Sequence, residues 1–506
     1  ARIFLGKIKT MVHGKPIDVS LELYELTLKK NYLEDAWFFD QRNKASLFAL
    51  NNRENEWLGQ LEIKNELLAR KSSLKSAITR LAIHTRAVED SAVRRQLTDS
   101  IRRFEKELRD TRELISGDPV LKLKKSFETI PKVREVQSML DSRTALLSYH
   151  LSGDELLTLL ITAHEFEYNR SAINRNFFQA IESFKHALAS VPADQRYSGS
   201  AAAFTLYQSL VSPLWNKLSR ARRLVIIPDD ELNYLPFEAL EDGNQDYLAE
   251  KFAIQYHFSA ALLEKDKERI SFKPALSFAP FASTTYRDAA GNTLHNLPLS
   301  REEIRGTDGE MLLDSAATRE RFIRSVNHFP LLHLATHAQL DNTDPARSFI
   351  AFFPGEPDFR LYVRDLYSLR MDSTNLVIIS ACQAAGGRQE KGEGMMSLSR
   401  AFAYAGCPNI ITSLWKNEGK PTSFMLQRFH HYLGRGYSKD ISLQYARLDL
   451  LNSPDIHPRF KSPPLWAHLV FYGYYEQGHT RSDWRWVTIG ILAILLGYYF
   501  IKRRMG

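Results

Sequence analysis

The sequence predicts an α/β protein whose main sheet is mostly parallel and has helices on both faces. From about residue 119 onward, short apolar runs of strand length alternate with stretches of helical periodicity. Strands that alternate with helices are typical of crossover connections between parallel strands. The alternation starts again after a linker at 265–273, which indicates two successive α/β halves.

Length and composition limit the class of protein. The chain has 506 residues, of which 44% are hydrophobic and 25% charged. These values are close to those of soluble globular proteins and exclude wholesale disorder, collagen and a polytopic membrane protein. At roughly 100–200 residues per domain we expect about three or four structural units. In chain order the expected segments are a helical segment at 1–55, a long helix or helical hairpin at 56–118, a first α/β half at 119–270, a second at 271–480, a transmembrane helix at 484–502 and a basic tail at 503–506.

The N-terminal segment is predicted to be helical. Residues 21–52 form an amphipathic pattern with aromatic and small residues where two helices would cross. The spacing resembles tetratricopeptide packing, in which each unit needs stacked neighbours to bury its apolar face. There are too few repeats here for an array. The chain opens with Ala1 rather than Met, and we expect it to be a piece of a longer chain whose start is missing.

Residues 61–112 show apolar residues at three- and four-residue steps, which predicts either one long helix or an antiparallel helical hairpin. Thirteen basic and eight acidic residues lie in this range. This excess of basic residues would suit an electrostatic contact with an acidic partner. A solvated helix face explains it more simply, and we favour that interpretation.

Several strands can be assigned from their apolar runs. In the first half, 144–163 reads as two strands joined by the turn Ser152-Gly153-Asp154, and a helical stretch follows from about Ser171 to Ala189. The other predicted strands lie within 223–228, 252–260, 275–280, 331–337, 348–353, 375–382 and 409–415.

The C-terminal segment has the features of a membrane anchor. Residues 487–501 carry no charge, tryptophans precede them, and Lys502, Arg503 and Arg504 follow. A buried terminal core helix is the alternative, but such a helix seldom has aromatic ends, a basic cluster and no polar face. The basic tail favours a cytosolic C-terminus, whereas insertion of a final segment usually leaves the preceding domain in the cytosol. We expect the domain that precedes this segment to lie in the cytoplasm.

Net charge limits the kinds of partner that we expect, and cysteine content limits the use of disulfides in the fold. The formal net charge is +8 and the sequence pI about 9.1, which is mild over this length. Most of the excess positive charge comes from 61–112 and the three terminal basic residues, so we do not expect nucleic-acid binding. With two cysteines, Cys382 and Cys407, no disulfide framework is expected.

Two predicted strands end in reactive side chains, His337 and Cys382, and loop-like sequence follows each. Loops after parallel strands meet at one edge of the sheet. A thiolate is the nucleophile in cysteine catalysis, and an imidazole can remove the thiol proton. The separation of 45 positions suits adjacent parallel strands. Glycines at 386, 387, 392 and 394 would let a substrate backbone approach.

Simpler roles compete with this interpretation. Cys382 could be an inert core thiol, although its place before a glycine-rich loop argues against that. His333 lies about 13 Å from His337 along the strand, so the two do not form a metal clasp, and His333 is expected to be structural. Cys407 is expected to be a small core residue. Two cysteines 25 residues apart do not make a zinc site, and no metal or cofactor is expected.

Four segments together resemble the CHAT domain, a caspase-clan module related to separase and often attached to tetratricopeptide repeats. The resemblance covers roughly 120–475. The segments are RRLVIIPDDELNYLPFEAL at 222–240, LLHLATHA around His337, NLVIISACQ around Cys382 and GEGMMSLSRAFAYAGCPNIITSLW at 392–415. The resemblance implies a cysteine protease with a His337–Cys382 dyad in a second, caspase-like half. It implies a pseudo-caspase-like first half and N-terminal helices that form a last tetratricopeptide unit.

This chain departs from the family pattern at three places. Family members usually have glycine after the histidine, where this chain has Ala338. The loop after the cysteine is one residue longer, and Lys416-Asn417-Glu418 replaces a common Val-x-Asp. The resemblance assigns the oxyanion to the main-chain amides of Ala338 and Cys382, and alanine retains that donor if its φ is negative. Glu393 is a candidate for a pocket that takes a basic side chain, and a solvated glutamate between two glycines is the alternative.

The sequence therefore predicts a membrane-anchored cysteine endopeptidase that cleaves a protein partner with His337 and Cys382. A regulatory protein bound to the N-terminal helices would gate it. The alternative is a catalytically silent scaffold that signals by protein assembly at a membrane.

Overall fold

The computed structural model describes most of the chain. The residues described are 2–44, 65–88, 90–116, 130–189, 197–260, 263, 272–287, 293–339, 348–355, 358–366, 369–371, 373–380, 389–390, 394–395, 398–415 and 419–476. Within these ranges no helix has both the length and the apolar character needed to cross a bilayer. The predicted span at 484–502 and the tail at 503–506 lie outside them.

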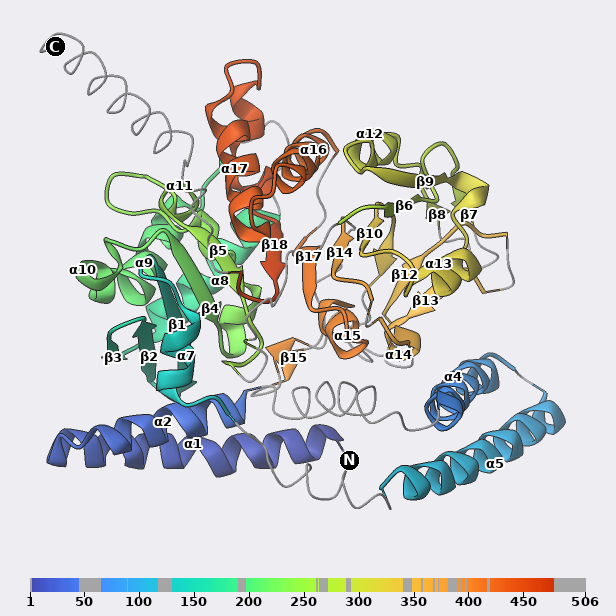
Figure 1. Cartoon of the computed structure of the whole chain (residues 1–506), viewed down its shortest axis with the longest axis horizontal. Coiled ribbons are helices and arrows are strands. Elements are labelled where there is room, and N and C mark those ends of the chain that lie inside the picture. Colours follow the sequence, from blue (N-terminus) through green and yellow to red (C-terminus); the bar gives the residue numbers. More distant parts are fainter. Residues whose placement is uncertain are drawn as a thin grey trace, which may run out of the picture.

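The N-terminal region consists of two helical pairs. Helices α1 (Arg2–Thr27) and α2 (Lys30–Asn43) pack together, and α4 (Asn65–Ala87) packs on α5 (Ser91–Ser116) (Figure 1). Residues 61–112 thus contain a helical hairpin rather than one long helix, because the chain reverses between residues 87 and 91. Helix α1 begins at Arg2, inside the segment 1–55 that was predicted to be helical.

One sheet of eleven strands runs through the molecule in the order β3-β2-β1-β4-β5-β18-β17-β14-β10-β6-β9 (Figure 1). The bounds are β1 Thr144–Ser152, β2 Glu155–Thr162, β3 Phe166–Ala172, β4 Arg223–Ile227, β5 Ala253–Tyr256, β6 Ala275–Ala279, β9 Gly309–Leu313, β10 Leu331–Leu334, β14 Leu376–Ile379, β17 Asn409–Ser413 and β18 Leu469–Tyr472. The α/β fold and its mostly parallel sheet are as predicted.

The two halves of the sheet run in opposite directions. Strands β1, β4 and β5 are parallel to one another, and so are β6, β10, β14 and β17. Strand β18 pairs in parallel with β5 but antiparallel with β17. The carboxyl ends of the two halves therefore lie at opposite edges of one continuous sheet.

Three details differ from the predictions. The helix expected from Ser171 begins at Arg175, because the chain first turns back after β2 and adds β3 to the antiparallel ladder. The run at 348–353 supplies β12 (Phe349–Ala351), which pairs with β11 (Ala338–Gln339) and β13 (Arg360–Tyr362) in a separate small sheet. Strands β3, β9 and β18 of the main sheet were not predicted.

Helices cover both faces of the main sheet. On one face the core includes residues of α8 (Arg175–Ala189), α9 (Ser200–Leu210), α16 (Lys420–Gly434) and α17 (Lys439–Asn452). On the other face, α1, α2 and α7 (Val133–Met139) cover the first half, while α13 (Arg319–Ser325), α14 (Val363–Leu366) and α15 (Leu398–Tyr404) cover the second. The remaining α-helices are α10 (Trp215–Leu218), α11 (Leu248–Lys251) and α12 (Ser300–Ile304), and the short strands are β7 (Tyr286–Arg287), β8 (Thr293–Leu294), β15 (Gln389–Glu390) and β16 (Gly394–Met395).

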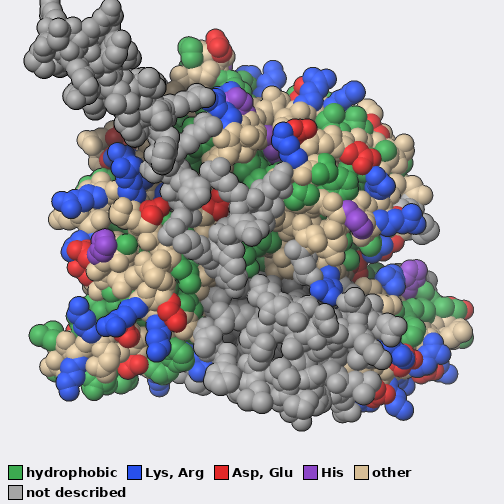
Figure 2. All heavy atoms as spheres, in the orientation of Figure 1, with side chains coloured by type: hydrophobic (Ala, Val, Ile, Leu, Met, Phe, Trp, Pro, Cys, Tyr) green, Lys and Arg blue, Asp and Glu red, His purple; other side chains and the backbone are tan. Residues whose placement is uncertain are grey.

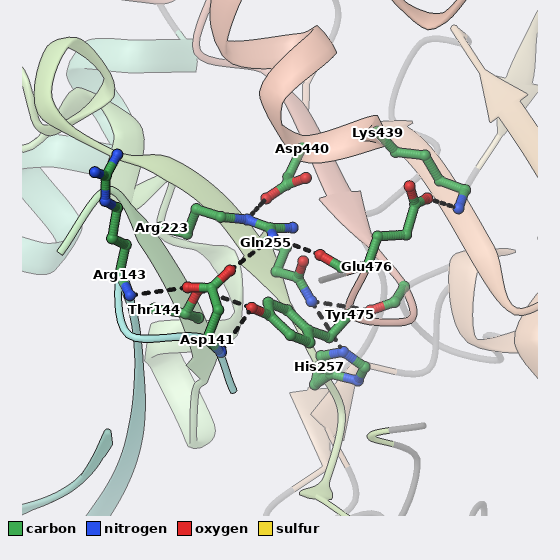
Figure 3. A network of polar contacts seen from close by, with 11 residues as sticks. Asp141, Arg143, Thr144, Arg223, Gln255, His257, Lys439, Asp440, Tyr475 and Glu476 are labelled. Carbon is green, nitrogen blue, oxygen red and sulfur yellow. Dashed lines mark hydrogen bonds and ion pairs between the residues drawn. The ribbon is translucent and has the colours of Figure 1, made fainter. Parts of the chain in front are cut away.

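A polar network joins the halves where β5 meets β18 (Figure 3). The Arg223 guanidinium on β4 donates to Asp440 of α17 at 2.6 Å and lies over the ring of Tyr475 at 4.6 Å. Gln255 donates to the main-chain oxygen of Gly473 at 3.2 Å. Charge-assisted hydrogen bonds between buried groups are strong, so this network fixes how the two halves of the sheet join at β5 and β18.

Acidic and basic side chains alternate on the face seen in Figure 2. No broad region of one sign is visible among the described residues on that face. This distribution is typical of a solvated surface rather than of a track for a nucleic-acid backbone.

Candidate active site

His337 lies just beyond the carboxyl end of β10. The strand itself is fully buried, and the chain becomes partly exposed at His337. Hydrogen bonds to Ala351, the last residue of β12, hold the backbone here. Thr336 Oγ1 donates to the main-chain oxygen of Ala351 at 2.6 Å, and the Ala351 amide donates to the His337 oxygen at 2.9 Å.

Two contacts within the described part of the chain orient the imidazole of His337. Its Nε2 lies 2.7 Å from the main-chain oxygen of His295, and its ring meets the buried ring of Phe281 edge to face at 5.0 Å. A carbonyl oxygen can only accept, so Nε2 carries the proton of this bond. In the neutral ring Nδ1 then holds the lone pair, which is the state that a general base needs.

Ala338 directly follows and begins β11, where it pairs with Ile350. Among the described residues four non-glycine residues have a positive φ, and Ala338 is not one of them. The backbone therefore accommodates alanine without strain in the place where the family has glycine.

The partner strand β14 is the direct neighbour of β10. The two are parallel, with Leu334 opposite Ile379, and the Ser380 amide donates to the Leu334 oxygen at 3.1 Å. The expected arrangement of adjacent parallel strands is present. Cys382 follows Ser380 by two positions. Cys382 and Glu393 themselves lie outside the described residues.

A buried cluster that sequence reasoning missed lies behind this edge. Glu303 of α12 places Oε1 2.9 Å from His333 Nε2 and accepts a short hydrogen bond from Ser380 Oγ. His333 Nδ1 lies 3.2 Å from His430 Nε2 of α16. His333 was expected to be a structural residue or one that supports the site from behind, and its side chain has no exposed surface.

Burial dominates the electrostatics of this cluster. It raises the pKa of Glu303 to about 8, although the Ser380 hydrogen bond acts in the opposite direction. Burial lowers the pKa of His333 to about 3, and burial followed by the nearby His333 lowers the pKa of His430 well below its usual value. Near neutral pH the carboxyl and both rings are therefore uncharged, which makes a fully buried cluster tolerable.

Cys407 is a core residue, as expected. Its side chain is buried, burial raises its thiol pKa to about 12, and Sγ donates to the Asn409 oxygen at 3.3 Å. A thiol in this state is not a nucleophile.

In the sequence, Glu303 and His430 are far from His333, and no helical or strand periodicity relates the three positions. Their convergence depends on how α12 and α16 pack on β10, and no local pattern encodes that packing. A polar residue inside an apolar strand, as in LLHL at 331–334, was the one available hint that buried partners exist.

Comparison with protein families identifies a matching family model. The family model described as CHAT domain matches residues 200–474, more than half of the chain. This range contains β4 to β18 and with them His337, Ala338, Cys382 and Glu393.

Two curated relatives of this chain are named as tetratricopeptide repeat proteins. Tetratricopeptide repeat protein 28 of Mus musculus is 25% identical over 358 residues, which cover 59% of this chain and 14% of that protein. The protein of the same name from Homo sapiens is 21% identical over 365 residues, covering 60% and 14%. The chain thus spans a small fraction of the length of these relatives.

Solved structures with a similar fold have low sequence identity. A Saccharomyces cerevisiae separase–securin complex gives a TM-score of 0.41 at 10% identity, covering 67% of this chain and 30% of that one. The Arg-specific cysteine proteinase gingipain R gives 0.36 at 11%, covering 59% and 75%. The family assignment depends on the domain match and not on these structures.

Proposed function

This chain belongs to the CHAT domain family, and from that premise we propose that it is a cysteine endopeptidase that cleaves a protein partner with His337 and Cys382. The observation that carries the proposal is the hydrogen bond from His337 Nε2 to the His295 oxygen. It leaves Nδ1 as the basic atom, at the end of the strand next to the one that leads to Cys382.

The reaction would proceed in two stages. His337 Nδ1 takes the proton of the Cys382 thiol, and the sulfur attacks the carbonyl carbon of the scissile peptide. The amides of Ala338 and Cys382 stabilise the oxyanion. The C–N bond then breaks as His337 returns the proton to the leaving amine. Water, deprotonated by His337, hydrolyses the thioester and restores the thiol.

The test compares three proteins on candidate partners. Wild-type chain is incubated with each partner, and newly formed N-termini are identified by mass spectrometry. Cys382→Ala and His337→Ala should each remove these termini, while Cys407→Ser should retain them because Cys407 is buried away from solvent. Cleavage that survives both of the first two substitutions would exclude this dyad.

Regulation and location complete the proposal. The N-terminal helices bind a regulatory protein that gates the protease, and residues 484–502 anchor it to a membrane with the catalytic domain in the cytoplasm. Glu393 is a weak candidate for receiving a basic substrate side chain.

A silent scaffold is the second candidate. It is favoured by the departures from the family pattern at Ala338 and in the loop after Cys382. A thiol-reactive electrophile separates the two proposals at neutral pH. Labelling of Cys382 that becomes much slower in His337→Ala supports the protease, and labelling that His337→Ala leaves unchanged supports the scaffold.

A further inference from the structure

Helix α1 is apolar on two opposite faces. Ile17 and Leu21 are buried in the cluster that joins α1 to α2 and the sheet. Val19, Leu23 and Leu26, at steps of four and three residues, are exposed. Since successive residues of a helix are about 100° apart around its axis, the two sets lie on opposite sides of α1. A surface helix usually has a polar outer face, so this exposed apolar stripe indicates a partner that covers it.

Exposed apolar side chains concentrate on this stripe. Across the described parts of the chain seven large apolar side chains are exposed, and four of them lie in 19–28. The most exposed are Leu26, at 82%, and Leu28, at 75%. The other three belong to three different elements, α5, α9 and β9. The sequence repeats the spacing of the stripe upstream in α1, at Leu5, Ile8 and Val12.

Contacts with the sheet hold the helix pair in a fixed orientation. Gln41 of α2 accepts a hydrogen bond from the Ala260 amide at 2.7 Å and donates to Ser148 Oγ at 2.8 Å. On α1, Glu25 accepts from the Tyr168 hydroxyl of β3 at 3.1 Å. Figure 1 shows the two helices side by side along one edge of the molecule. The face of α1 that carries the stripe is therefore turned away from the sheet.

Charges divide α1 into two halves of opposite sign. Residues 2–15 contain basic but no acidic residues, namely Arg2, Lys7, Lys9 and Lys15. Residues 16–27 contain acidic but no basic residues, namely Asp18, Glu22 and Glu25. Two such helices in parallel would place like charges together, whereas an antiparallel pair places each half on the opposite half of its partner. Rotation about a two-fold axis near residue 14 produces that antiparallel pair, so the helix is complementary to itself.

We propose that the exposed stripe of α1 is a dimer interface, on which α1 of a second copy of this chain packs antiparallel. Removal of the stripe from water supplies the free energy of association, and the charged halves set the direction of pairing. In this arrangement Glu22, whose side chain is exposed, comes near Lys7 of the partner subunit. The dimer goes beyond the proposed function and does not depend on it, since neither His337 nor Cys382 takes part.

Sedimentation equilibrium of the full chain tests the dimer, in a neutrally buoyant detergent because the proposed span is retained. Wild type should be dimeric at micromolar concentration. Leu23→Arg puts a charge into the apolar interface and should raise the dimer dissociation constant about a hundredfold or more. Val93→Arg, at an exposed apolar position of α5, is the matched control and should leave it unchanged. A monomeric wild type, or equal effects of the two substitutions, would overturn the proposal.

Charge reversal tests the direction of pairing. Glu22→Lys and Lys7→Glu should each raise the dissociation constant by about fivefold or more, because each places like charges together at two symmetric contacts. The two substitutions combined should return it to within about twofold of wild type. Glu34→Lys makes the same charge change at an exposed position of α2 and should have no effect. A double variant weaker than either single variant would exclude antiparallel pairing.

Cross-linking with a short bismaleimide locates the two-fold axis. In a Cys382→Ser background the remaining native thiol, Cys407, is buried. Lys15→Cys lies near the proposed axis and should cross-link two copies, whereas the thiols of Thr27→Cys would be roughly 39 Å apart and should not react together. Parallel pairing would link both variants. Cross-linking at 27, or none at 15, would contradict the antiparallel dimer. None of these readouts involves proteolysis, so a failed cleavage assay leaves them valid.

Discussion

The carboxyl group of Glu303 and the imidazole of His333 lie 2.9 Å apart in the interior, although thirty positions separate them in the sequence. Both side chains are buried, and Ser380, two residues before Cys382, shares the same carboxyl oxygen. The end of β14 is thus tied to α12 and β10 by a carboxyl group that stays protonated near neutral pH.

Glu303 should make stability depend on pH. The folded protein retains the Glu303 proton up to pH of about 8, whereas an unfolded glutamate loses it near about 4.3. Stability therefore falls as pH rises through this interval. Glu303→Gln should gain stability relative to wild type by about 1.4 kcal/mol per pH unit between about pH 5 and pH 8. Urea unfolding at several pH values measures this difference.

In that comparison His333 and His430 are present in both proteins, so their own titration cancels. Glu302→Gln, at the neighbouring and partly exposed position, is the control. A similar slope in both variants would show that the buried carboxyl is not its source.

Breaking the buried pair of Arg447 and Glu238 should be costly. Their charged groups lie 3.1 Å apart with almost no exposed surface, and Tyr256 donates to the same carboxylate at 2.6 Å. Arg447→Met leaves a buried carboxylate without its cation and should lower the free energy of unfolding by about 3–5 kcal/mol. The additional substitution Glu238→Gln should recover part of that loss.

The exposed pair of Arg321 and Glu310, at 3.0 Å, provides the comparison. Arg321→Met should cost less than about 1 kcal/mol by the same unfolding measurement. Equal costs for the two arginines would contradict the role of burial.

Trp37 should contribute strongly to the packing of α2 on the sheet. Its side chain is buried with Val133, Val225 and Ile227, and Nε1 donates to the Pro131 oxygen at 2.9 Å. Trp37→Ala should lower the free energy of unfolding by about 3–5 kcal/mol through loss of apolar contact. Phe38→Ala, at the adjacent and partly exposed position, should cost clearly less in thermal or urea unfolding. The reverse order would exclude this packing role.

The C-terminal anchor can be tested by flotation. If 484–502 is the membrane span that we propose, the full chain should float with phosphatidylcholine–phosphatidylserine vesicles. Ile494→Arg puts a charge near the middle of the span, which costs about 2.5–3.5 kcal/mol, and should reduce the floated fraction. Ile501→Arg, at the end of the span, should not. Equal flotation of all three proteins after a carbonate wash would argue against a membrane span.

Local pattern was sufficient for much of the fold. The apolar runs around Val225, Leu332 and Val377 each became a buried strand, since such segments are stable only when covered on both faces. The adjacency of β10 and β14 was also predictable, because residues that end successive parallel strands meet at one edge.

Other features depend on partners far away in the sequence. The run at 348–353 is apolar enough for the main sheet, yet β12 pairs with its own neighbours β11 and β13 in a separate sheet. Strand β18 was missed because LVFY at 469–472 is short and follows a proline-rich stretch, and its place between β5 and β17 is set by those strands.

The sequence by itself determined the strands, the helical segments and the position of His337 at a strand end, because the period of apolar residues encodes local structure. Only the tertiary structure decided that the two halves run in opposite directions, that Glu303, His333 and His430 converge behind Ser380, and that Gln41 lies on the amide of Ala260. These relationships depend on the register and direction of pairings between distant segments. The free energy of such pairings comes from burial shared by both partners, so neither segment alone contains the information.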